Sequence, residues 1–331
     1  MPISRRALAL SSLVLTGEGA RPGGAAAQET APYPSRAVTW IVPFNAAGVT
    51  DSTSRLASRK LGQQLGQPVV IENRPGAGGT LGTEYAARAA PDGYTVLYGT
   101  NAAMSGAPAL YRRLGYHPVR SFTPLQGLFE SSNVLVANPL RPYRTAEEFI
   151  RFARANPGRV NLAHAGVGTS THLTAVLFES IAGIEMTHVA YTGAAPALTD
   201  LMAGNVDVMF DYVATTRNPI AEGRMRPLAV TARARIPALP AVPTVAEVGL
   251  PDAWSSTWSG LFMPAGAPAS VVERLSNAAA AVIRDPEMRA FGEGNGSRPM
   301  EELNGEAFAR FVTAEMERWG EIVRRSGAQP L

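Results

Sequence analysis

The chain has 331 residues, no cysteine and a formal net charge of only +3 at pH 7. This composition excludes disulfides, thiolate metal sites and cysteine nucleophiles, and an apolar fraction of 46% excludes a disordered chain. The arginines are dispersed without interleaved aromatic residues, so we expect no nucleic-acid partner. A chain of this length suits a protein of two lobes.

The N-terminus has the features of an export signal. Arg5 and Arg6 precede a short apolar run over residues 7–15, and small residues follow at 25–27. This pattern predicts a signal peptide over residues 1–27, cleaved near Ala27, and hence a periplasmic protein. The apolar run is too short to cross a bilayer, which takes about 20 residues. The twin-arginine route and the general secretory route both stay open.

A strand, a loop of small residues and a helix are predicted over residues 40–60. Residues 40–42 are apolar and β-prone, residues 45–48 favour a turn, and Thr50 or Asp51 is expected to cap the helix. The first turn of a helix has N–H groups without helical partners and a partial positive charge, so this loop suits a carboxylate or phosphate. An ordinary first strand–helix unit of an α/β domain explains the same stretch equally well.

Strand–helix alternation continues and predicts a mainly parallel sheet covered by helices. Strands predicted at 69–71 and 94–98 flank a glycine-rich turn and a helix at 83–89. The turn resembles a dinucleotide fingerprint, but Leu81 stands where the third glycine belongs, and a ribose-binding acid about 20 residues on is not evident. We therefore expect a structural turn or a loop beside a ligand.

The arrangement of strand, small-residue loop and helix occurs a second time. A strand predicted at 160–165 leads into small residues at 166–171, and Thr169 or Ser170 is expected to cap a helix that runs to about residue 181. No lysine follows, as a phosphate-binding P-loop would require. A later strand at 206–210 ends at Asp211, and amphipathic helices at 270–283 and 306–325 close the chain.

Eight segments, taken in order, make the chain similar to a known family. They are VPFNAAGVTD, VVIENRPGAGGTLG, PDGYTVLYG, HAGVGTSTHL, HVAYTGAAPALTDLMAGNVDVMF, RPLAVTARAR, LPAVPTVAEVGLP and GLFMPAGAP. Through them the chain resembles the Bug-type family, the extracytoplasmic solute receptors of tripartite tricarboxylate transporters. The resemblance implies an α/β protein with the type II periplasmic-binding-protein fold, in which two α/β lobes enclose a ligand cleft. It implies a first lobe of residues 28–131 and 255–331 and a second lobe of residues 132–254.

The same resemblance implies a small carboxylate ligand, held by backbone amides and ordered waters of the loops at 44–50 and 166–170. The candidate ligand-binding residues are Phe44, Asn45, Ala46, Ala47, Gly48, Thr50, Asp51, Gly166, Gly168, Thr169, Ser170, His172, Tyr191, Thr192, Gly193 and Asp211. No cofactor, metal or catalytic residue is expected. The implied partners are integral membrane transporter subunits, and the receptor itself is expected to be a monomer.

Two residues depart from the family's pattern. Ala47 stands where the family has the first of two glycines, which removes freedom for a positive φ angle. Thr192 stands where a basic residue is common, so a second ligand carboxylate would lose a partner. These departures favour a monocarboxylate or a less charged ligand.

Two other functions compete with that of a transport receptor. A hydrolase is disfavoured because the chain has no Gly-x-Ser-x-Gly elbow, and the four histidines lack the i,i+4 spacing of a metal site. His172 is then expected to pack or hydrogen-bond, and Asp51 to cap its helix. A sensory receptor that signals to a membrane sensor stays open, because either partner would bind the lobe surfaces.

Overall fold

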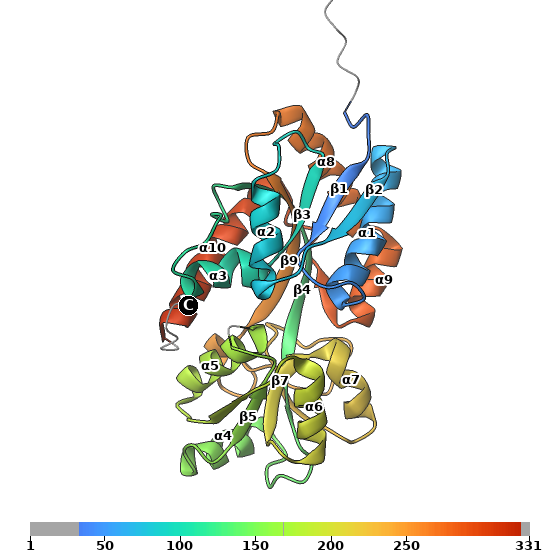
Figure 1. Ribbon diagram of the computed structural model, residues 1–331. Helices are drawn as coiled ribbons and strands as arrows, with labels where there is room; N and C mark the ends of the chain where they lie inside the picture. Colours follow the sequence, from blue (N-terminus) through green and yellow to red (C-terminus); the bar gives the residue numbers. More distant parts are fainter. Residues whose placement is uncertain (1–32, 168, 326–331) are drawn as a thin grey trace, which may run out of the picture. The chain divides into compact units, whose positions relative to one another are not determined.

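The computed structural model describes residues 33–167 and 169–325, which form two sheets joined by one long strand. The predicted signal peptide and Gly168 lie outside the described residues. The long strand, β4 (Phe122–Ala137), runs from one sheet into the other (Figure 1). The first sheet also contains β1 (Val38–Val42), β2 (Val69–Asn73), β3 (Thr95–Thr100), β9 (Ser256–Pro264) and β10 (Ser297–Pro299). The second contains β5 (Asn161–His164), β6 (Thr187–Ala190), β7 (Val208–Tyr212) and β8 (Arg226–Val230).

The strand order is β2-β1-β3-β9-β4-β7-β5-β6, with β8 and β10 also paired to β4. Pairing is parallel between β1 and its neighbours and between β5 and its neighbours. It is antiparallel wherever β4 or β9 takes part. The carboxyl ends of β1 and β5 therefore lead directly into the two predicted small-residue loops.

The chain passes between the sheets at two adjacent places. Along β4, Ser132 pairs with Ser256 of β9, and the next residue, Asn133, pairs with Tyr212 of β7. The return crossing lies just before β9, where the Ser255 amide still donates to the Thr231 carbonyl at 2.9 Å. We call the parts built on the first and second sheets the first and second lobes.

Helices cover both sheets. The helices of the first lobe are α1 (Val49–Leu65), α2 (Thr80–Ala87), α3 (Ala107–Leu110), α8 (Ala269–Ile283), α9 (Pro286–Gly294) and α10 (Gly305–Arg325). The helices of the second lobe are α4 (Ala146–Ala155), α5 (Ser170–Ala182), α6 (Ala194–Ala203) and α7 (Val213–Ala221). Short helical turns are η1 (Ala77–Gly79), η2 (Ala102–Gly106) and η3 (Pro251–Ala253). No helix within the described ranges combines the length and the apolarity that crossing a membrane requires.

The apolar periodicity of the sequence accounts for the packing. Trp40 of β1 and Leu61 of α1 lie in the core of the first lobe, and Phe149 and Phe178 lie in that of the second. A separate cluster joins the lobes, because Trp319 of α10 shares it with residues of α3 and α5. The C-terminal helix therefore belongs to the first lobe and also packs against the second.

Candidate functional site

A cavity of about 790 Å³ is lined by both lobes. Its first-lobe wall includes Phe44 and Thr50, and its second-lobe wall includes Thr169 and Tyr191. The crossing strands also line the cavity, β4 through Ser131 and β9 through several of its residues. A volume of this size suits a small organic molecule.

Five helices begin at the wall of this cavity, and one ends there. The lining includes first-turn residues of α1, α2, α5, α6 and α7, namely Val49, Thr50, Thr80, Ser170, Thr171, Ala194, Ala214 and Thr215. It also includes Phe291 and Gly292 from the last turn of α9. Each helix start carries roughly half a positive elementary charge and N–H groups without helical partners. Because more helices begin here than end here, the arrangement suits an anion.

The side chains that line the cavity add little positive charge. Within the described ranges the lining contains no lysine, arginine or histidine, and its one carboxylate is Asp211. Hydroxyl groups are common there, as at Tyr98, Ser131, Tyr191 and Thr257. An anion in this cavity would therefore be held by amide and hydroxyl donors, which can reach roughly 1.5–3 kcal/mol each when the partner is charged.

The first loop, between β1 and α1, is held by a buried carboxylate. Asp51 accepts from the Ala47 amide at 3.0 Å, from Arg55 Nε at 2.8 Å and from Asn73 Nδ2 at 3.0 Å. Asn73 Nδ2 also donates to the Phe44 carbonyl at 3.1 Å. The Arg55 hydrogen bond is the main cause that lowers the pKa of Asp51 to about 2. These bonds fix the loop without occupying the cavity.

The cap predicted for α1 is wrong. The helix begins at Val49, its N-cap is Gly48, and no side chain caps it, so neither Thr50 nor Asp51 takes that place. Asp51 bonds instead to the amide of Ala47, whose φ angle is 67°. The alanine thus adopts the left-handed conformation at a cost of roughly 1–2 kcal/mol.

The second loop, between β5 and α5, uses hydroxyl groups. Thr169 is the N-cap of α5, and its Oγ1 accepts from the His172 amide at 3.5 Å. The Ala165 amide donates to Thr171 Oγ1 at 3.1 Å, and Ser170 hydrogen-bonds the Tyr212 hydroxyl. The loop is thereby tied both to its own helix and to the end of β7.

Asp211, at the end of β7, has one unused carboxylate oxygen. Its Oδ2 accepts from Thr215 Oγ1 at 2.8 Å, whereas its buried Oδ1 has no hydrogen-bond partner among the described residues. Burial raises the pKa of this carboxyl to about 6. The free oxygen can accept from a ligand hydroxyl or amine, and the protonated acid can donate to a ligand carboxylate.

The predicted residues divide into two groups. Those that line the cavity are Phe44, Thr50, Gly166, Thr169, Ser170, Tyr191, Thr192 and Asp211. Those described but absent from its lining are Asn45, Ala46, Ala47, Gly48, Asp51, His172 and Gly193. In the second group, Asn45, Ala46, Ala47 and Gly48 are exposed residues of the first loop, and Asp51 holds that loop through its hydrogen bonds.

Comparison with known proteins identifies the chain. A model of the "Tripartite tricarboxylate transporter family receptor" matches residues 53–328. The chain belongs to this family. It is a solute-binding receptor with the two-lobed periplasmic-binding-protein fold, and delivery of a solute to a transporter is the family's role.

Three similar proteins illustrate the relationship. A UPF0065 protein from the tcbD–tcbE intergenic region of Pseudomonas sp. strain P51 is 38% identical over 96% of this chain and 93% of its own length. Rpa4515 of R. palustris, solved with adipate, is 33% identical with a TM-score of 0.78, covering 90% of this chain and 100% of that one. MatC of Rhodopseudomonas palustris, solved with bound malate, is 34% identical with a TM-score of 0.75, covering 88% and 100%.

Sequence reasoning missed part of this receptor's cavity wall. Tyr98, Asn101 and Tyr111 come from the first lobe, and Tyr212 and Thr215 come from the end of β7 and the start of α7. Asn101 and Tyr111 flank η2 and α3, which were not predicted as helical. The signal for Tyr212 and Thr215 was available, because they directly follow Asp211 at a predicted strand end.

Proposed function

We propose that this receptor captures a small aliphatic carboxylate in the cavity between its lobes and is not an enzyme. The observation that carries this proposal is the convergence of five helix starts on a cavity whose described lining contains no basic side chain. Helix amides and hydroxyl groups are then the donors that bind the ligand carboxylate.

The proposed ligand class agrees with the two solved relatives named above, which hold adipate and malate. The ionised form of Asp211 and the absence of a basic residue at Thr192 favour a monocarboxylate, or a carboxylate that also carries a hydroxyl or amine. The proposed location is the periplasm. The proposed partners are integral membrane subunits that engage the monomeric receptor once its lobes have closed on the ligand.

Proline substitutions at the first helical position test the role of the amides. Val49 and Ser170 open α1 and α5, and each follows an N-cap with extended backbone angles, which tolerates a following proline. Val49→Pro and Ser170→Pro remove one amide donor each and keep the helix. Val49→Ala and Ser170→Ala are the matched controls, and Ser170→Ala also separates loss of the hydroxyl from loss of the amide.

The measurement is a thermal-shift and calorimetric titration of protein from Gln28 onward with small mono- and dicarboxylates. A ligand at 100 times its dissociation constant should stabilise the native state by about 2.7 kcal/mol. We expect the two proline variants to bind at least tenfold more weakly than their alanine controls. Equal affinities within each pair would refute binding by these amides, and steady turnover of a carboxylate ester would refute the receptor-only role.

A further inference from the structure

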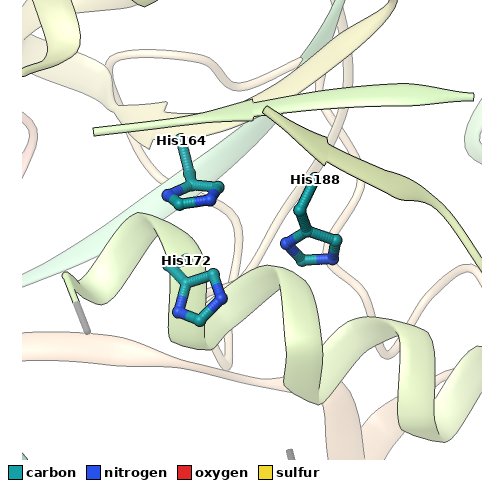
Figure 2. Close-up of side chains that lie close together, drawn as sticks. All are labelled: His164, His172 and His188. Carbon is teal, nitrogen blue, oxygen red and sulfur yellow. The ribbon is translucent and has the colours of Figure 1, made fainter. Parts of the chain in front are cut away.

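Three of the four histidines gather behind the second loop. His164 ends β5, His188 lies in β6, and His172 lies in the first turn of α5, which covers that face of the sheet. His188 pairs with Leu162, two residues before His164, so both side chains lie on the same face of the sheet. Figure 2 shows the three rings facing one another. One ring nitrogen from each histidine lies within 4.8 Å of the other two.

A carboxylate orients one of these rings. His188 Nε2 lies 2.7 Å from Glu179 Oε2, so the proton on this nitrogen is donated to the carboxylate. The other nitrogen, Nδ1, is then left with a lone pair. It is buried and has no hydrogen-bond partner among the described residues. A carboxylate that fixes the tautomer of a histidine in this way is the usual support of a metal-ligating imidazole.

The other two rings connect the cluster to the second loop. His164 Nδ1 accepts from the Gly166 amide at 3.2 Å. The backbone amide of His172 is capped by Thr169, and its ring lies beside those of His164 and His188, with centroids 4.5 and 5.4 Å away (Figure 2). If His164 binds a metal ion through Nε2, its proton moves to Nδ1 and the bond from Gly166 is given up. Binding of a metal ion here would therefore reach the loop that lines the cavity.

We propose that His164, His172 and His188 form a binding site for one divalent transition-metal ion, with Zn²⁺ as the expected occupant and the fourth position open. Imidazole nitrogens suit Zn²⁺, Ni²⁺ and Cu²⁺, and three histidines with an open position form a known zinc geometry. Nitrogens bound to one tetrahedral Zn²⁺ at 2.0–2.1 Å lie about 3.3 Å apart, so the three rings must move closer together when the ion binds. His172 and His188 are only partly buried, which gives an ion access.

Tag-free protein from Gln28 onward, freed of metal with a chelator, is titrated with Zn²⁺ in a calorimeter. Co²⁺ absorption then reports the ligand set independently. We expect one Zn²⁺ per chain and a tetrahedral Co²⁺ spectrum. His172→Gln and His188→Gln should each weaken Zn²⁺ binding at least 100-fold. Glu179→Gln removes the charge beside His188 and keeps an oxygen that can accept from the Met186 amide, and it should weaken binding about tenfold.

The remaining histidine supplies the control. His117 lies in the first lobe, where its Nδ1 faces the Val119 amide at 3.2 Å, and His117→Gln should bind Zn²⁺ as the wild type does. Circular dichroism of each metal-free variant shows whether it has folded. Zn²⁺ binding that survives His172→Gln and His188→Gln, or that is lost in His117→Gln, would overturn the site, as would the absence of saturable binding to the folded wild type. Neither result tests the carboxylate proposal, which is titrated separately with metal-free protein.

Discussion

At the scale of single residues, Asp211 lowers the stability of the fold and has a carboxylate oxygen that can still accept a hydrogen bond. The side chain is fully buried, it has one oxygen without a partner among the described residues, and burial raises its pKa to about 6 from an ordinary value of 3.8. A carboxyl whose pKa is raised on folding lowers stability as pH rises from 3.8 to 6, and the full loss persists above 6. A group kept at such a cost is a candidate for function rather than for stability.

Asp211→Asn should therefore stabilise the free protein at neutral pH. We expect a gain of roughly 1–3 kcal/mol at pH 7.5 and a much smaller gain at pH 4, because the native carboxyl is protonated there. Urea denaturation at the two pH values measures the difference. The exposed Asp252→Asn is the control and should change stability little at either pH. A gain that is equal at pH 4 and pH 7.5 would contradict the assignment of the cost to ionisation.

At the scale of elements, the first loop depends on one side-chain amide. Asn73, at the end of β2, donates both to the Phe44 carbonyl and to Asp51 Oδ1. It thereby joins the start of the loop to the first turn of α1. Asp51 itself stabilises the fold above pH 3.8, and this contribution is lost as pH falls toward about 2.

Asn73→Ala should loosen this loop. The change leaves a carbonyl and a buried carboxylate without that donor, so we expect a loss of about 1–3 kcal/mol at pH 7. Hydrogen–deuterium exchange of residues 44–51 should become faster, while exchange in the second lobe stays the same. Asn45→Ala, at an exposed position of the same loop, is the matched control. Unchanged exchange in residues 44–51 would show that Asn73 does not hold the loop.

The elements also show what the sequence could reveal. Both strand–loop–helix units were predicted because, in each, small and hydroxyl residues separate an apolar strand from an apolar helix. Only the second half of β4 was predicted, since Pro124 and Gly127 interrupt its first half where the register with β9 shifts. Helix α7 was missed because Pro219 lies within it. The histidine cluster was missed because its members come from three elements, and local spacing does not report such contacts.

At the scale of the whole molecule, α10 links the two lobes. Trp319 is fully buried in the cluster that joins α3 and α10 of the first lobe to Leu173 and Leu177 of α5. Its Nε1 donates to the buried Glu315 at 3.0 Å. Helix α5, whose start lines the cavity, therefore packs along its side against the C-terminal helix α10.

Trp319→Ala should destabilise the receptor by about 3–5 kcal/mol, as expected for loss of a buried tryptophan. Trp319→Phe keeps most of the apolar volume and should cost clearly less. Urea denaturation of both variants gives the comparison, with Arg324→Ala as a control at an exposed position of the same helix. If Trp319→Ala lowered the free energy of unfolding no more than Arg324→Ala does, the contact between the lobes at Trp319 would not contribute to stability.

The helix starts around the cavity also set how much negative charge it can accommodate. More helices begin at the cavity than end there, so their dipoles favour negative charge inside it. An ionised Asp211 offsets part of this effect, and its pKa is raised to about 6. Protonation of this carboxyl at lower pH removes the offset, so a more negative ligand is then better accommodated. The ligand charge that this receptor prefers would then depend on the surrounding pH. The set of residues that contact the ligand would stay the same.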